Sequence, residues 1–275
     1  MASMKTRIIT AVIGIPLLVL ILLFGTRSFW IINALISLAT GMMTVELLTA
    51  KKLHQNLLIS VPSVIFSVAM PLFSFTPFFY LPIALYILVM FSILMLNNDK
   101  LHYDSLSFAL SGSFVIAFGM SCLTYLNAVN PAYNSFFFAA CLAIPWMADA
   151  GAYFAGTFFG KHKLCPKISP KKTVEGFAGG ALFSIIASFL VGYIFKTFIF
   201  PDAYINYLAL LIIGVLDSVI SVIGDLSFSL IKRHCGIKDY GSIFPGHGGM
   251  LDRCDSVIFT CPLVLIVHQL IPVIM

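Results

Sequence analysis

The stretch NYLALLIIGVLDSVISVIGDLSFSL, residues 206–230, decides the fold class. It is long and apolar enough to cross a bilayer, which takes roughly 20 mostly apolar residues. The whole chain of 275 residues shares this character, with 60% hydrophobic residues, 10% charged residues and a mean hydropathy of +1.03. Soluble domains are about one-quarter charged. The composition therefore predicts an all-α, polytopic membrane helical bundle and excludes a soluble globular domain.

Outward from this stretch, other apolar runs bring the expected number of transmembrane helices to nine. Their expected ranges are 8–26, 28–50, 55–75, 78–97, 106–128, 134–158, 176–199, 206–230 and 256–274. The first run is long for the apolar core of a signal peptide, and no cleavage site follows it, so we keep it as a helix. We expect an N-terminal region of five spans, residues 1–130, and a C-terminal catalytic region, residues 131–275.

The placement of lysine and arginine predicts the orientation of these helices. With the N-terminus in the cytoplasm, only Arg27 and Lys196 of the sixteen basic residues fall on the outer side. Two long polar loops, 160–176 and 232–256, then share the cytoplasmic face. No transit peptide is recognised, which favours the inner (plasma) membrane of a bacterial cell. We therefore expect a multi-pass protein there, with its active site facing the cytoplasm.

Two acidic residues within the expected spans look like walls of a cavity. Placing a carboxylate at mid-membrane costs roughly 2.5–3.5 kcal/mol, so we expect each one to have a bonding partner or a functional role. Asp225 shares one helical face with Ser229 and Lys232. Helix packing through small polar residues explains serines but not a carboxylate. Asp149 lies on a comparable face that runs into the first polar loop, and its glycines predict close helix packing.

Two further acids lie within the expected spans and carry weaker signals. Glu46 lies close to Lys51 and Lys52 in the sequence, which leaves an ion pair and a functional role equally open. Asp217 points about a quarter-turn away from the Asp225 face of a regular helix.

The two polar loops gather the residue types that phosphoryl and nucleotidyl transfer use. Asp225 and Asp252 flank the second loop, and carboxylates with open positions suit Mg²⁺. Lysines and arginines bind phosphate oxygens, and successive glycine N–H groups form anion-binding nests. A tight turn between helices, with His247 as an ordinary loop residue, is the simpler interpretation of the glycines alone.

The loops also carry a resemblance to a known family. SLIKRHCGIKDYGSIFPGHGGMLDRCDS (229–256) resembles the signature of the phosphatidate cytidylyltransferases, and DAGAYFAGTFFGKHKLCPKISPKKTVEG (149–176) resembles a second stretch shared in that family. Four positions depart from the family's usual residues: Ala150, Thr157, Val174 and Phe228. The resemblance implies transfer of a cytidylyl group from CTP, or dCTP, to phosphatidic acid, which gives CDP-diacylglycerol and pyrophosphate.

The resemblance also implies cofactors and site residues. It assigns Mg²⁺, with Mn²⁺ as a substitute, to Asp225 and Asp252, the pair that the residues themselves indicate, and it implies a second site for a monovalent cation such as K⁺. The expected catalytic residues are Asp225, Asp239, Asp252, Lys232, Arg233, Lys238, His247 and Arg253. The expected substrate-binding residues are Asp149, Ser169, Lys171, Lys172, Glu175, Ser229, Gly246, Gly248 and Gly249.

Two alternative functions stay open. An ion-coupled membrane transporter would use Asp149 and Asp225 as coupling residues, although the internal repeats typical of many transporters are not found. A cytidylyltransferase that acts on another lipid phosphate would share the whole site. The expected partners are CTP or dCTP, phosphatidic acid and the bilayer, without nucleic acid. A homodimer is compatible with the family, but the sequence carries no signal for it.

Overall fold

The computed structural model describes residues 29–97, 99, 101–243 and 248–275, and the chain divides into two compact units. The first unit comprises Met1–Pro131 and His234–Cys254, and the second comprises Ala132–Arg233 and Asp255–Met275. Each unit is therefore built from two separate stretches of chain. The expected first span, 8–26, lies outside the described residues.

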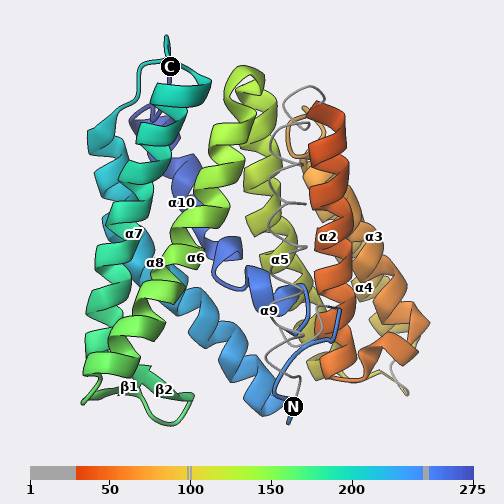
Figure 1. Ribbon diagram of the computed structural model, residues 1–275. Coiled ribbons are helices and arrows are strands. Elements are labelled where there is room, and N and C mark those ends of the chain that lie inside the picture. Colours follow the sequence, from red (N-terminus) through yellow and green to blue (C-terminus); the bar gives the residue numbers. More distant parts are fainter. Residues whose placement is uncertain (1–28, 98, 100, 244–247) are drawn as a thin grey trace. The chain divides into compact units, whose positions relative to one another are not determined.

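The first unit is a group of apolar helices (Figure 1). Its helices are α2 (Phe29–Ala50), α3 (Leu57–Phe73), α4 (Tyr80–Leu96), α5 (Tyr103–Val129), the 3₁₀ turn η1 (Leu53–Gln55) and the short α9 (Leu251–Cys254). Tyr86 of α4 ties three of these helices together. Its hydroxyl lies 2.8 Å from the Ser63 hydroxyl of α3 and donates to the Ala109 carbonyl of α5 at 3.3 Å.

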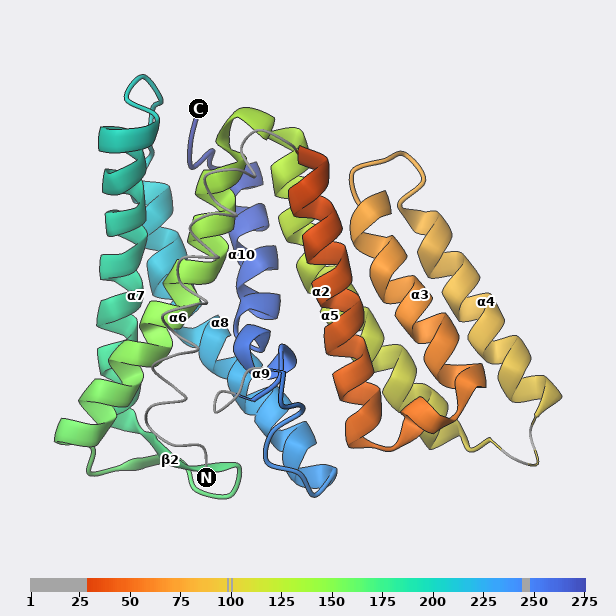
Figure 2. The same cartoon turned by 45° about the vertical axis from the view of Figure 1, so that its right-hand side comes forward.

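The second unit pairs long helices around a small β-hairpin. Its elements are the 3₁₀ turn η2 (Pro131–Tyr133), α6 (Asn134–Phe159), β1 (Lys163–Cys165), β2 (Ser169–Thr173), α7 (Val174–Ile194), the π-helical turn η3 (Phe195–Ile199), α8 (Tyr207–His234) and α10 (Val257–Leu270). Figure 2 shows α6 and α7 side by side, with the hairpin at the end where they connect.

Glycines let α6 and α7 approach closely, as their spacing in the sequence predicts. A Cβ on Gly156 would lie 3.6 Å from the Gly176 Cα, and a Cβ on Gly180 would lie 3.0 Å from the Ala148 carbonyl oxygen. A larger side chain at these positions would push the two helices apart. The close approach places the hairpin that joins them against α6.

The first polar loop is more ordered than the sequence indicates. The strands of the hairpin are antiparallel, and Lys163 pairs with Thr173 and Cys165 with Ser169. Helix α7 then begins at Val174, two residues before the expected start, because the Thr173 hydroxyl accepts a hydrogen bond from the Gly176 N–H at 3.0 Å and caps the helix. The all-α prediction therefore lacks this two-stranded sheet.

Five helical segments among the described residues are long and apolar enough to cross a membrane. They are Trp30–Ala50, Tyr103–Val129, Pro131–Phe159, Val174–Ile199 and Tyr207–His234. Helices α3 and α4 are apolar but shorter, with 17 residues each, and α10 has 14 residues. The protein is thus a multi-pass membrane protein, and the count of nine spans remains a prediction.

Candidate functional site

The polar face of α8 points into the second unit, as its spacing predicts. Ser221 is fully buried and Lys232 is nearly so, whereas Leu216, Ile223 and Leu230 on the other side of the helix are exposed. The helix also continues to His234, four residues past its expected end, so that Lys232 is held on a rigid element. The inward direction of this face is confirmed.

Asp225 meets a lysine from the first polar loop. The Lys172 ammonium group on β2 lies 2.6 Å from Oδ2 of Asp225, and the Ser229 hydroxyl donates to Oδ1 at 3.1 Å. About a quarter of each charged side chain is exposed. The hairpin thus brings Lys172 to the polar face of α8, and three of the expected site residues meet at one carboxylate.

Two more carboxylates complete this group. Asp149 of α6 accepts a hydrogen bond from the Ser256 hydroxyl at 3.1 Å. Gly224 has no side chain to block Asp255, whose carbonyl oxygen would lie 2.7 Å from a Cβ there. Burial, together with the nearby Asp225 carboxylate, raises the pKa of Asp255. Asp255 is not among the expected site residues, although it is the last acid of the signature.

We call Asp149, Asp225, Asp255, Lys172 and Lys232 the acidic cluster. The Lys232 ammonium group opposes the rise in the pKa of Asp255, which the carboxylates favour. Three carboxylates against two ammonium groups leave one negative charge unmatched when all five are ionised. Because buried charges need partners, this charge is balanced either by a proton on Asp255, whose pKa is raised, or by a further cation.

Asp217 lies deeper in the same unit. It is fully buried, and its carboxylate accepts hydrogen bonds from Ser184 of α7, at 3.2 Å, and from Thr260 of α10. Its quarter-turn offset from the Asp225 face therefore marks a second polar contact between helices. Helical periodicity gives no sign of this contact, because Ser184 and Thr260 come from distant stretches of the chain.

The second polar loop belongs to the first unit up to Cys254, and there Asp252 binds backbone amides. Its Oδ2 accepts hydrogen bonds from the N–H groups of Tyr240 at 2.7 Å and Gly249 at 3.0 Å. Gly248 has a φ of 90°, in the left-handed region that glycine adopts readily. These contacts fix the orientation of the Asp252 carboxylate. The expected residues Gly246 and His247 lie outside the described residues.

Glu46 of α2 binds the same loop. It is 6% exposed, and its carboxylate accepts hydrogen bonds from the N–H groups of Met250 and Leu251. Lys51 instead lies over the ring of Phe108, 4.8 Å from its centroid. Glu46 thus binds the backbone of the loop, where the sequence left an ion pair with a lysine open, and a functional role for it stays a prediction.

The remaining expected site residues lie at the surface. Glu175 accepts hydrogen bonds from the N–H of Lys161 at 3.0 Å and from the ring of His162 at 2.7 Å, and so ties the start of the hairpin to α7. Ser169 is partly exposed. Five residues are exposed: Lys171, Arg233, Lys238, Asp239 and Arg253.

The donor chemistry fits a hard cation, although the two expected ligands belong to different units. Asp225 is in the second unit and Asp252 in the first. Within the described part of the chain, no three His, Cys, Asp or Glu side chains are grouped closely enough to hold an ion. Mg²⁺ does not require such a group, because it is usually bound through one or two carboxylates together with substrate phosphates.

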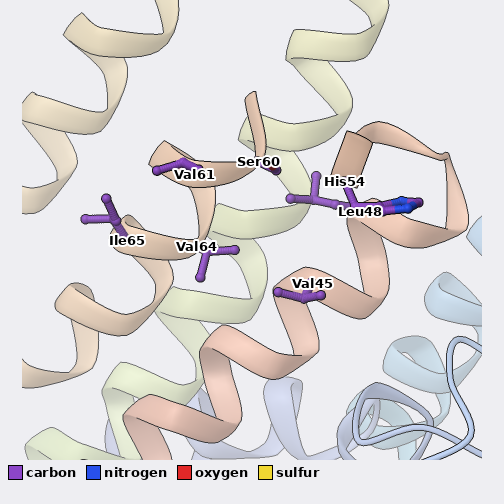
Figure 3. Close-up of a pocket in the computed structure, with 7 residues that line it drawn as sticks. All are labelled: Val45, Leu48, His54, Ser60, Val61, Val64 and Ile65. Atoms are coloured by element: carbon purple, nitrogen blue, oxygen red, sulfur yellow. The ribbon is translucent and has the colours of Figure 1, made fainter. Parts of the chain in front are cut away.

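A separate cleft lies between α2 and α3 in the first unit (Figure 3). Its volume is about 280 Å³. It is lined by Val45, Leu48, His54, Ser60, Val61, Val64 and Ile65. This lining contains no carboxylate and no lysine, so it lacks the groups that would bind a metal–nucleotide complex.

Comparison with known proteins finds similarity along nearly the whole chain. Residues 5–271 match the sequence model of a family described as the cytidylyltransferase family. A phosphatidate cytidylyltransferase of Bacillus subtilis (strain 168) is 35% identical over 272 residues, which cover 95% of this chain and 96% of the relative. One of Staphylococcus haemolyticus (strain JCSC1435) is 34% identical over 266 residues, covering 94% and 97%. One of Staphylococcus aureus (strain COL) is 48% identical over 120 residues, 44% of each chain.

Proposed function

Because the chain belongs to the cytidylyltransferase family, we propose that it transfers the cytidylyl group of CTP to phosphatidic acid, giving CDP-diacylglycerol and pyrophosphate. One observation carries this proposal beyond the family. Three carboxylates and two lysines converge among apolar helices, in the acidic cluster. A lipid phosphate whose acyl chains stay in the bilayer needs a polar site of this kind, carried by membrane helices.

The reaction forms and breaks one phosphorus–oxygen bond. A phosphate oxygen of phosphatidic acid attacks the α-phosphorus of CTP in line. The bond from the α-phosphorus to the bridging oxygen breaks, and pyrophosphate leaves with the electron pair. The attacking phosphate is already ionised near pH 7, so a strong general base is not needed. The protein's task is positioning and charge neutralisation.

The residues of the acidic cluster divide this task. Lys172 and Lys232 bind phosphate oxygens, since ammonium groups act as point charges for phosphate. Ser229 holds the Asp225 carboxylate, and Ser256 holds Asp149. Asp225 and Asp252 would hold Mg²⁺, which, when bound, offsets the negative charge of the phosphates.

The site is proposed to face the cytoplasm from the plasma membrane. The bias of lysine and arginine toward one side supports this orientation, and both substrate-binding loops then meet CTP on the side where it is made. The relatives compared above come from bacteria, which supports a plasma-membrane location.

The test is a transfer assay with two labels. Purified protein in vesicles is incubated with Mg²⁺, phosphatidic acid and CTP labelled at either its α- or its γ-phosphorus. The expected result is α-label in the lipid phase and γ-label in aqueous pyrophosphate. Absence of lipid-phase label in all conditions would refute the proposal, and omission of phosphatidic acid is the control.

The same assay separates the choices of lipid. Polyprenyl phosphate and an ether-linked phosphatidic acid replace phosphatidic acid, at equal concentration, in parallel reactions. Preferred labelling of one of these would keep the chemistry and change the substrate. Labelling that occurs only with phosphatidic acid supports the proposal in full.

A further inference from the structure

Glu46 joins α2 to a loop more than 200 positions away in the sequence. Its Oε1 accepts a hydrogen bond from the Met250 N–H at 3.0 Å, and its Oε2 accepts one from the Leu251 N–H at 2.8 Å. These two amides stand where α9 begins. Each oxygen of the buried carboxylate thus has its own backbone donor, which fixes both the side chain and the loop.

The loop is shaped to receive this carboxylate. A Cβ on Gly241 or on Gly249 would overlap the Glu46 carboxylate. Neither glycine has a positive φ, so their backbone conformations do not require glycine. The space that Glu46 occupies therefore accounts for glycine at both positions.

The same short segment orients Asp252. The Gly249 N–H donates to Oδ2 of Asp252 at 3.0 Å, while the next two N–H groups donate to Glu46. Three successive amides therefore bind two carboxylates. A shift of the segment away from Glu46 would move the donor that holds Asp252.

We propose that Glu46 is a positioning residue that sets the orientation of Asp252 through the backbone of residues 249–251. This inference rests on the proposed function, in which Asp252 helps to bind the metal and nucleotide. Both Glu46 oxygens accept N–H groups, so Glu46 acts on the loop and not on the substrate. Its place in α2 makes one of the N-terminal helices part of the catalytic machinery.

The decisive variant is Glu46→Gln. The amide keeps the size of the side chain, but its nitrogen faces one of the two backbone donors, so one hydrogen bond is lost. Partners that orient a metal ligand typically contribute 10–100-fold in activity or metal affinity. We expect turnover to fall by about 10–100-fold and half-activation by Mg²⁺ to need a higher concentration. The KM for phosphatidic acid should stay near its wild-type value.

Thr44→Val is the matched control. Thr44 is buried on the same helix, and its hydroxyl bonds to Ser67 of α3 at 2.7 Å instead of to the loop. This variant also removes a buried hydrogen bond of α2. We expect it to leave turnover and Mg²⁺ dependence unchanged, once rates are divided by the amount of folded protein.

Amide hydrogen exchange gives a readout that does not need activity. In Glu46→Gln, without substrates, exchange should speed up at residues 249–252 and remain unchanged in α3–α5. Faster exchange at the loop with wild-type turnover and Mg²⁺ dependence would overturn the inference, as would unchanged exchange. Faster exchange throughout the first unit, with activity lost only in proportion to folded protein, would reduce Glu46 to a folding role and also overturn it.

A double-mutant cycle tests the fit between Glu46 and Gly241. Gly241→Ala should reduce activity in the wild type, because its Cβ overlaps the Glu46 carboxylate. In a Glu46→Ala background the overlap is gone, so the added loss should be several-fold smaller. The relief is expected to be partial, since the Cβ would still lie 3.2 Å from the Gly249 Cα. The inference would be contradicted if Gly241→Ala lowered activity by the same factor in the Glu46→Ala background as in the wild type.

The two proposals fail in different ways. A wild-type protein that labels no lipid refutes the proposed function, and the role of Glu46 in that reaction falls with it. An active wild type with an equally active Glu46→Gln refutes the positioning role alone.

Discussion

In the first unit, Asp252 and Glu46 accept hydrogen bonds from backbone amides of one loop, whereas in the second unit Asp225 is held by an ammonium group and a hydroxyl. The backbone N–H donors are fixed by the fold, so they stay bound to their carboxylates. The Lys172 side chain is long and flexible, and it can exchange its carboxylate partner for a phosphate. We therefore expect the first unit to position groups and the second unit to neutralise the charge that changes during the reaction.

Asp225→Asn should have the largest effect, because it removes the carboxylate charge that Lys172 and Ser229 hold. The loss of a partner that merely orients a metal ligand lowers activity by 10–100-fold, so loss of the ligand itself should lower turnover by at least about 100-fold. The assay is label transfer to lipid, with membrane insertion and helix content as controls. Residual activity close to that of the wild type would remove Asp225 from the site.

Asp252→Asn and Asp252→Ala sharpen the comparison within the first unit. Asparagine keeps an oxygen for the Tyr240 and Gly249 amides, so the loop should keep its slow hydrogen exchange while turnover falls by at least about 100-fold. The Asp252→Ala variant should lose both the slow hydrogen exchange of the loop and the turnover. If Asp252→Asn kept the wild-type dependence on Mg²⁺, the metal assignment would be wrong.

Lys172→Met tests whether charge balance governs the second unit. The variant leaves three carboxylates with one ammonium group, so added Mg²⁺ should raise its thermal midpoint more than that of the wild type. Turnover should fall about 10-fold or more, as a charge-assisted phosphate contact is lost. Lys171→Met, at the exposed neighbouring position, should show the wild-type response of the midpoint to Mg²⁺. An equal response in both variants would contradict charge balance as the governing factor.

Lys196→Ala should have the smallest effect. The Lys196 ammonium group donates hydrogen bonds to the carbonyls of Pro201 at 2.6 Å and Ala203 at 2.9 Å, in the turn that follows α7 and η3. Their loss should cost about 1 kcal/mol of stability, while turnover per folded molecule stays at the wild-type value. Reduced turnover would extend the functional region well beyond the acidic cluster.

The sequence predicts helices well here because long apolar runs have few alternatives. Helix α2 ends at Ala50, its expected end, and α6 ends one residue past its expected end. The hairpin was missed because its strands are three and five residues long and rich in lysine. Such short strands lack the alternation of apolar and polar residues that predicts a strand.

The site was partly predictable for a similar reason. The polar face of α8 follows from helical periodicity, and its direction is confirmed by burial. Glu46 could not be ranked, because its partners are main-chain N–H groups, which every residue except proline carries. The quarter-turn offset of Asp217 hides its role in helix contacts, because its hydroxyl partners, Ser184 and Thr260, lie 33 and 43 positions away.

The bond from Glu46 to Leu251 spans 205 positions, and this has a consequence for biosynthesis. At 5–20 residues per second, roughly 10–40 s separate the emergence of the acid from that of its partner. During this interval α2 is already made, but the amides that will solvate its carboxylate do not yet exist. A chain that stops before residue 250 lacks both N–H donors of this carboxylate, so the contact that joins α2 to the loop forms only when translation is nearly over.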